Sequence, residues 1–200
     1  MQIDVTLALS KTKRDLIDVA RQLFAKKGVE NTTMNDIAEA SQRGRRTLYT
    51  YFRSKQDIYK AVIESELNGL YAKLEEVIKR EIAADEKLLL LAFTRLNAIK
   101  EVVTRNGTLR ADFFRDIWQV ENVRKEFDKN EIHYLESILQ DGVDKGVFQI
   151  ADVRKTAVIL HYAFKGLEVP VIRGVMKLEY NKKEDREIIS NLVFNGLYRD

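Results

Sequence analysis

Apolar residues recur along almost the whole chain at spacings of three and four, which is the period of an amphipathic helix. The segment before Gly28, for example, has apolar residues at helical spacing, which makes it an amphipathic helix. They are Leu16, Ile17, Ala20, Leu23 and Phe24. No stretch alternates apolar and polar residues for long enough to indicate a strand, and the chain has a single proline. The pattern therefore predicts an all-α fold of about nine helices.

Two short helices around a tight turn are predicted in residues 32 to 55, which read TTMNDIAEASQRGRRTLYTYFRSK. Thr33, followed three residues later by Asp36, is an Asp variant of the capping box and starts the first helix. Residues 41 to 44 then break the helical pattern with turn-forming side chains. Residues 45 to 52 resume the pattern, so the second helix combines one apolar side with a basic and aromatic surface.

A helix-turn-helix unit places the start of its second helix in the major groove of DNA, where arginine can bind guanine. Arg45, Arg46 and Thr47 stand at that position, while Tyr49, Tyr51 and Lys55 follow where phosphate contacts are expected. The full set of predicted DNA-binding residues is Thr33, Arg43, Gly44, Arg45, Arg46, Thr47, Tyr49, Thr50, Tyr51 and Lys55.

The segment LIDVARQLFAKKGVENTTMNDIAEASQRGRRTLYTYFRSKQDIYKAV resembles the DNA-binding domain of the TetR (tetracycline repressor) family of bacterial transcription regulators. The shared pattern comprises LFA-x-x-G, a threonine before D-I-A, then T-L-Y-x-Y-F and S-K-x-D. The chain departs from it at the turn, where Gln42 replaces the usual glycine and Arg43 adds a charge. The resemblance implies three parts: a flexible arm over residues 1–9, a helix-turn-helix domain over 10–56, and a helical effector-binding and dimerisation domain over 57–200.

In this family the last two long helices form the dimer interface, and here they are expected at about 152–177, with a kink or end at Pro170, and 183–198. Their apolar stripes can also pack within one chain. The residues predicted at the dimer interface are Val153, Leu160, Phe164, Leu167, Ile188, Ile189, Leu192 and Val193.

A small-molecule effector is also implied by the resemblance, although no pattern identifies its chemistry. Aromatic and polar residues of the middle helices are candidates to line its pocket, but aromatic residues on helix faces are more often core. The predicted ligand-binding residues are Phe93, Asn97, Phe113, Phe114, Trp118, Tyr134, His161, Tyr162 and Lys165.

The net charge of +3 over 200 residues is small, but it is unevenly distributed. Residues 1–60 hold 12 Lys and Arg against 7 Asp and Glu, a net of +5, and residues 61–200 hold 22 against 24, a net of −2. This distribution suits an N-terminal part that binds nucleic acid. It also suits a helical protein-interaction module with a basic face, which would bind its partner without regard to DNA sequence and so remains an alternative.

No cysteine is present, and the chain has neither a signal-peptide pattern nor roughly 18 successive apolar residues. A cytoplasmic protein without membrane association is therefore expected. Two isolated histidines do not indicate a metal site, so no bound metal is predicted. No catalytic or cofactor motif occurs, so neither enzymatic activity nor a bound cofactor is predicted. Together with the helix-turn-helix, the resemblance implies a homodimeric regulator that binds a pseudo-palindromic double-stranded operator. Because repression is the commoner outcome in the family, the resemblance also implies a repressor that leaves the DNA when a small molecule binds, although nothing in the residues excludes an activator.

Overall fold

The computed structural model describes residues 11–106 and 117–194, and these residues form eight α-helices and no strand. The all-α prediction is confirmed. The chain divides into two compact units, the first made of Met1–Glu66 and Thr104–Val120 and the second of Leu67–Val103 and Glu121–Asp200. Both α4 (Lys55–Ile78) and α5 (Ala84–Arg105) cross this division, so each has one end in each unit.

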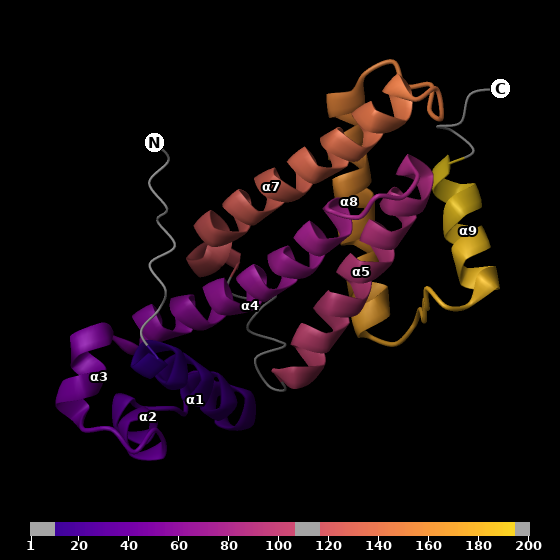
Figure 1. Ribbon diagram of the computed structural model, residues 1–200. Coiled ribbons are helices and arrows are strands. Elements are labelled where there is room, and N and C mark those ends of the chain that lie inside the picture. Colours follow the sequence, from indigo (N-terminus) through magenta and orange to yellow (C-terminus); the bar gives the residue numbers. More distant parts are fainter. Residues whose placement is uncertain (1–10, 107–116, 195–200) are drawn as a thin grey trace, which may run out of the picture. The chain divides into compact units, whose positions relative to one another are not determined.

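The first unit contains α1 (Lys11–Lys27), α2 (Met34–Ala40), α3 (Arg45–Tyr51) and the start of α4 (Figure 1). The helices share one small core, in which the ring of Phe24 meets the edge of Tyr59 with centroids 6.2 Å apart. The buried apolar side chains of this core are Leu16, Ile17, Ala20, Phe24, Ile37, Ala38, Leu48, Phe52, Ile58, Tyr59, Val62 and Ile63.

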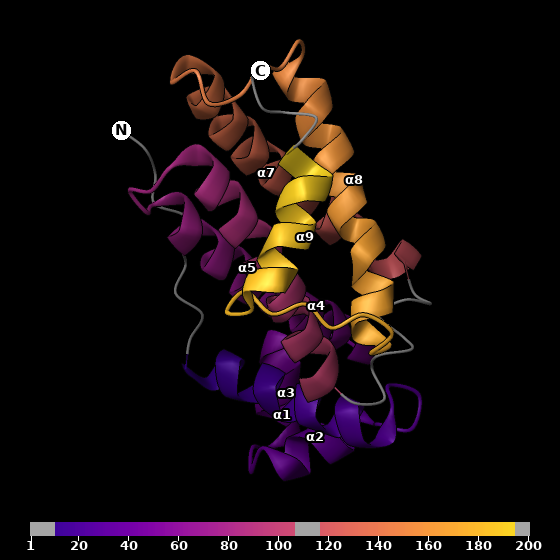
Figure 2. The ribbon, with the colours of Figure 1, turned by 90° about the vertical axis from the view of Figure 1, so that its right-hand side faces the viewer.

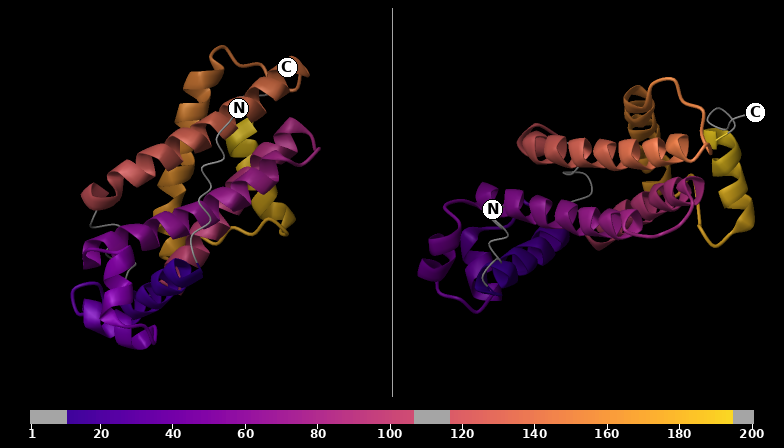
Figure 3. Two further views of the ribbon diagram at one scale, coloured as in Figure 1. Left: turned by 60° about the vertical axis from the view of Figure 1, so that its left-hand side comes forward. Right: turned by 45° about the horizontal axis from the view of Figure 1, so that its top comes forward.

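The second unit contains the rest of α4, most of α5 and most of α7 (Ile117–Asp144), together with α8 (Val153–Ile172) and α9 (Lys183–Phe194). The last of these is seen clearly in Figure 2. The second half of α4 runs alongside α7 in both views of Figure 3, and Tyr71 stacks on Tyr134 there with centroids 5.2 Å apart. The core of the second unit is built from side chains of all five helices, among them Leu74, Leu91, Leu139, Phe164 and Phe194.

One helix end differs from the sequence prediction. The helix expected to run to about 177 ends at Ile172, and Pro170 lies inside its last turn. Gly174 closes this helix with φ +71, a backbone conformation open to glycine, and its N–H donates to Val171 O at 3.1 Å.

The C-terminus of α7 is closed by a Schellman motif at Gly146. Gly146 has φ +71 and its N–H donates to Val143 O at 3.0 Å, while the N–H of Val147 donates to Gly142 O at 2.8 Å. This turn brings Phe148 back onto Gly142, where a Cβ atom would lie 2.2 Å from a ring carbon of Phe148.

Replacing Gly142 with alanine should therefore lower the free energy of unfolding by about 1–3 kcal/mol, because the ring of Phe148 is only 2% exposed and has no room to retreat. Gly69 is the matched control, since it lies in α4 with no atom within 4 Å of the position that a Cβ would take. Gly69→Ala should raise stability by about 0.5–1 kcal/mol through helix propensity. Urea unfolding measures both, and a Gly142→Ala protein as stable as Gly69→Ala would show that this packing is loose.

Candidate functional site

The start of α2 is fixed by the capping box that the sequence predicts. The backbone N–H of Asp36 donates to Thr33 Oγ1 at 3.1 Å, and the N–H of Thr33 donates to Asp36 Oδ2 at 2.8 Å. The pKa of Asp36 lies below its usual value, mainly because of the hydrogen bond from the Thr33 backbone. A second capping box opens α4, where Ser54 and Asp57 exchange bonds of 3.0 and 3.1 Å. Both ends of the α2–α3 unit are therefore set by local sequence.

The turn between α2 and α3 is a Schellman motif that uses Gln42 where glycine is usual. Gln42 has φ +53, the only positive φ of a non-glycine residue in the described part of the chain. Its N–H donates to Glu39 O at 3.0 Å, and the N–H of Arg43 donates to Ala38 O at 3.1 Å. The substitution at position 42 thus preserves a left-handed cap and places a strained residue in it.

Gln42→Gly should consequently raise the free energy of unfolding by about 0.5–1 kcal/mol. It removes a left-handed strain of about 1–2 kcal/mol and adds back the chain entropy of glycine. Ser41 is the control, because its φ of −79 is right-handed and its hydroxyl donates to Ala38 O at 3.0 Å. Ser41→Gly should destabilise the protein in the same urea titration. A Gln42→Gly protein less stable than the parent would show that the left-handed residue is not strained.

The two arginines at the start of α3 have different surroundings. Arg45 Nε donates to Asn35 Oδ1 at 2.7 Å, and Asn35 in turn donates to Glu39 Oε1 at 2.8 Å, so Arg45 is braced against α2. Arg46 is exposed. Leu48, fully buried, anchors the opposite side of the helix, and Tyr49 is 51% exposed. The helix therefore presents Arg46 and Tyr49 to solvent from a fixed backbone.

The remaining predicted DNA-binding residues are less uniform. Thr33, Arg43, Gly44 and Thr50 are exposed, and Thr47, Tyr51 and Lys55 are half-buried. Arg43 lies 3.8 Å from Asp15 of α1.

Lys55 has a structural role that the sequence did not reveal. Its ammonium group donates to the carbonyl oxygens of Val29 at 2.7 Å and Glu30 at 3.2 Å. It therefore holds the connection between α1 and α2.

The structure does not gather the predicted ligand-binding residues into one pocket. Phe93 is 1% exposed and packs edge-on against Tyr180, so it belongs to the core. Asn97 is exposed, and Tyr134 is stacked on Tyr71. Phe113 and Phe114 lie outside the described residues, as does the side chain of Trp118.

His161 and Lys165, in contrast, meet at Asp128. Lys165 Nζ lies 2.6 Å from Asp128 Oδ2, and His161 Nε2 lies 3.5 Å from Asp128 Oδ1. Tyr162, the next residue of α8, is 60% exposed, and its ring centroid lies 5.6 Å from Lys165 Nζ.

This contact is the edge of a buried charged cluster formed by Arg95, Asp128, Glu131, His161, Lys165 and Glu168, which come from α5, α7 and α8. Arg95 is 1% exposed, and its guanidinium binds Glu131 and Glu168, with Nη2 lying 2.5 Å from Glu168 Oε1. Glu131 is fully buried and its Oε2 lies 3.3 Å from His161 Nδ1.

The ionisation of this cluster follows from its pairing. Burial lowers the pKa of the Arg95 guanidinium, but the two glutamates outweigh burial and raise the pKa. Burial raises the pKa of Asp128, but His161 and Lys165 outweigh it and lower the pKa to about 2. Burial likewise lowers the pKa of His161, and the carboxylates of Asp128 and Glu131 raise it above the ordinary value. Asp128 and Arg95 are therefore charged at neutral pH.

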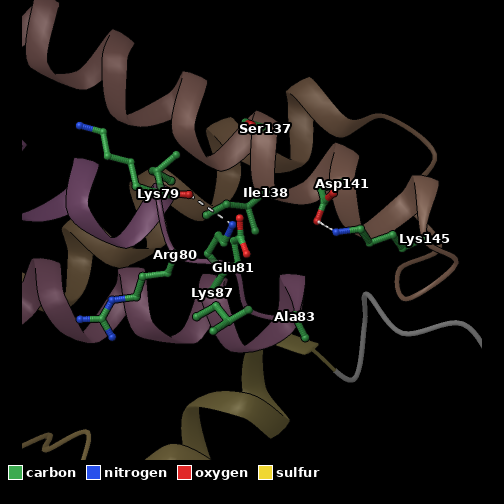
Figure 4. A pocket seen from close by; sticks show the side chains of 11 residues that line it. Lys79, Arg80, Glu81, Ala83, Lys87, Ser137, Ile138, Asp141 and Lys145 are labelled. Carbon is green, nitrogen blue, oxygen red and sulfur yellow. Dashed lines mark hydrogen bonds and ion pairs between the residues drawn. The ribbon is translucent and has the colours of Figure 1, made fainter.

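Two open pockets lie on the second unit. The one in Figure 4, of about 610 Å³, is at the turn from α4 to α5 against α7, and it contains none of the predicted ligand-binding residues. Lys145 pairs with Asp141 at its rim. The other, of about 520 Å³, includes the predicted residue Tyr162 and one member of the charged cluster. It is lined by Lys125, Asp128, Lys129, Asn130, Ile132, His133, Glu136, Arg154 and Tyr162.

Comparison with known proteins decides the family. Residues 16–62 match the family model described as "Bacterial regulatory proteins, tetR family". The chain is similar to the HTH-type transcriptional regulator YfiR of Bacillus subtilis, at 25% identity over 87% of this chain and 84% of that protein. It is also similar to the HTH-type transcriptional repressor KstR2 of Rhodococcus jostii, at 31% identity over 48% of this chain and 47% of that protein. The chain belongs to the TetR family.

A solved structure of a transcriptional regulator from Cytophaga hutchinsonii has the same fold as this TetR-family chain, with a TM-score of 0.71 over 92% of this chain and 97% of that one, at 22% identity. The TetR-family chain is a DNA-binding transcriptional regulator, and α2, the turn and α3 form its helix-turn-helix. None of the helices in the described part of the chain is long and apolar enough to span a membrane.

The side of α8 that this TetR-family chain leaves exposed differs from the side predicted for the dimer interface. Leu160 and Phe164 are 8% and 2% exposed and belong to the core of the single chain, so a second chain cannot reach them as predicted. Ile189, at 5%, is also buried. Val153, Leu167 and Val193 are half-buried and pack against the core, and the side chain of Leu192 lies outside the described residues.

The exposed side of α8 is nevertheless apolar. Ile159, Tyr162 and Val169 are 61%, 60% and 41% exposed, and their spacing of three and seven places them on one face of the helix. On α9, Ile188, one of the residues predicted at the dimer interface, is 59% exposed. We call Ile159, Tyr162 and Val169 the α8 outer face.

Proposed function

We propose that this regulator is a homodimeric repressor that binds a pseudo-palindromic operator in the cytoplasm through α3 and leaves it when a small molecule binds the second unit. The exposed Arg46 at the start of α3, on a helix fixed by Leu48 and by the turn, supports the proposal most strongly. The similarity to a relative named as a repressor supports the direction of regulation. The proposal assigns no catalytic role to the chain.

Base recognition is assigned chiefly to Arg46, with Arg45 as its braced neighbour. An arginine at this position can donate two hydrogen bonds to guanine O6 and N7. Arg45 already donates its Nε hydrogen to Asn35 of α2. This bond holds the Arg45 side chain in place and leaves its two Nη groups as donors for DNA. Thr47 stays with the two arginines as a proposed contact in the major groove. The other proposed contacts position the protein on the DNA backbone. They are Thr33, Arg43, Gly44, Tyr49, Thr50, Tyr51 and Lys55.

Arg46→Ala should weaken binding to the operator by about 1–3 kcal/mol and relax the preference at one or two base pairs in each half-site. Arg173, an exposed arginine at the C-cap of α8, provides the control, since its removal lowers the net charge equally. Fluorescence anisotropy with operator and scrambled duplexes measures the effect. Equal affinity of the Arg46→Ala and Arg173→Ala proteins for the operator would move base recognition away from Arg46.

The effector is proposed to bind the second unit, residues 67–103 and 121–194, where both open pockets lie. Because α4 and α5 each continue from one unit into the other, a change in the second unit can shift the balance of states in the first. The ends of these two helices in the first unit are joined by an ion pair. The guanidinium of Arg105, the last residue of α5, pairs with Glu66 of α4.

A genome-wide footprint combined with deletion of the gene tests the proposed repression. We expect transcripts that start beside the bound sites to increase in the deletion strain. A decrease of the same transcripts would show an activator, and the absence of discrete bound sites would contradict sequence-specific regulation altogether.

A further inference from the structure

Two carboxylates and an imidazole converge inside the second unit. Asp128 and Glu131 are three residues apart on one face of α7, and His161 faces them from α8. One ligand atom from each of the three residues can be chosen so that all lie within 4.8 Å of one another. Nitrogen and carboxylate oxygen are the donors that first-row divalent metal ions accept in proteins.

The imidazole of His161 lacks the hydrogen bonds that a buried histidine needs. Its side chain is fully buried, yet neither Nδ1 nor Nε2 has a hydrogen-bond partner among the described residues. The separations of 3.3 Å to Glu131 and 3.5 Å to Asp128 exceed the usual range of an N–H···O bond. Glu131 Oε2 also lacks a hydrogen-bond partner there. Such orphaned polar atoms are rare in a core and need an explanation.

The charges of the cluster point to a missing cation. Three carboxylates, those of Asp128, Glu131 and Glu168, face two permanent cations, Arg95 and Lys165. One further positive charge balances this buried site, either a proton on His161 or a metal ion bound to the neutral imidazole.

One of the two cations is able to withdraw. Lys165 pairs with Asp128 from a position that is 23% exposed, so its ammonium group can swing into solvent. A divalent ion that replaces Lys165 would balance the three carboxylates together with Arg95.

We propose that Asp128, Glu131 and His161 bind one divalent transition-metal ion, in competition with Lys165. The side chain of Asp128 is 20% exposed and lines the pocket of about 520 Å³, which provides a path for the ion and for water to complete its coordination. Bonds of 2.0–2.2 Å require ligand atoms about 3.4 Å apart at a tetrahedral angle. The three ligand atoms lie within 4.8 Å of one another, so the side chains must close in by up to about 1.4 Å when the ion binds. The site revises our sequence-based expectation of no metal, and it is independent of the proposed operator and effector.

Titration of the chelator-treated, tag-free protein with Co²⁺, Zn²⁺ and Mn²⁺ tests the proposal, with visible absorption reporting Co²⁺ and calorimetry reporting the other ions. The chain has no cysteine, so a coloured cobalt complex must use nitrogen and oxygen ligands. We expect one ion per chain for at least one of these metals. His161→Gln and Asp128→Asn should each weaken binding about 100-fold or more.

His133 is the matched control, because it is the only other histidine and its side chain is 77% exposed. His133→Ala should bind the metal as the parent does. Lys165→Met should bind it about tenfold more tightly, since the competing ammonium group is gone. This variant alters a half-buried group at the edge of the cluster and, with circular dichroism as a check of folding, keeps the test valid if His161→Gln unfolds.

Absence of binding at metal concentrations on the order of 1 mM would overturn the proposal and leave a protonated His161 between two carboxylates as the missing cation. Binding that survives in His161→Gln but is lost in His133→Ala would also overturn it. So would an affinity that Lys165→Met leaves unchanged, because the proposed ion must compete with that ammonium group.

Discussion

Arg95→Met is expected to lower the free energy of unfolding by about 3–5 kcal/mol, the largest effect of any single substitution considered for this regulator. The guanidinium of Arg95 is 1% exposed and lies between Glu131 and Glu168. Methionine fills a similar volume, but it leaves two carboxylates buried and facing each other without their shared cation.

Urea unfolding in the presence of a chelator measures this loss, and two controls define its origin. Arg95→Met combined with Glu168→Gln should recover part of the stability, because one of the two unpaired charges is removed as well. Lys73→Met breaks an exposed ion pair with Glu101 and should cost about 0–1 kcal/mol. An Arg95→Met protein as stable as Lys73→Met would mean that water or rearrangement satisfies the glutamates.

Ile159→Asp is expected to convert the dimer to monomer. Ile159 is 61% exposed at the α8 outer face, so a charge there is tolerated by the single chain, but it would be desolvated and unpaired between two chains. Sedimentation at about 10 μM should then report the chain mass of 23.2 kDa instead of twice that value. Affinity for the full operator should fall about 100-fold or more, because the second half-site no longer binds from the same molecule.

Val175 provides the control for this substitution, since it is 80% exposed and follows the end of α8. Val175→Asp should remain dimeric and bind the operator as the parent does. A dimeric Ile159→Asp protein would place the interface on another surface. Loss of the dimer in both variants would show that added negative charge, rather than the position on the outer face, is responsible.

Local signals in the sequence were sufficient for the DNA-binding unit. Thr33 with Asp36 and Ser54 with Asp57 set helix starts through hydrogen bonds between neighbours, which depend on no distant residue. The side chain of Asp152 likewise accepts from Lys155 N–H at 2.8 Å and starts α8. These bonds are encoded within four residues, so they can be read without the fold.

The sides of α8 could not be assigned in this way. The helix carries apolar residues all round, with Leu160 and Phe164 facing the core and Ile159 and Tyr162 facing outward. A periodic pattern identifies a core side only when the other side is polar. The sequence therefore predicted that α8 has an apolar interface stripe, but it selected the stripe that packs within the chain.

The charged cluster was missed although the sequence contains a signal for it. Glu131 lies four residues after Phe127 and four before Leu135, and all three are buried on one side of α7. A charged residue at an apolar position of a helix indicates a buried partner. What the sequence cannot supply is which partner, because Arg95 is 36 residues away along the chain.

Selection of binding sites from random-sequence DNA, carried out in parallel with the parent protein and Arg46→Ala, tests most directly whether α3 of a dimer reads the operator. The parent should enrich one pseudo-palindrome whose half-site centres lie about 34–36 Å apart, or a multiple of this distance. Arg46→Ala should lose its preference at the same base pair in both halves. Enrichment of no motif by the parent, or of the same motif with undiminished preference by Arg46→Ala, would contradict the assignment of α3 as the recognition helix.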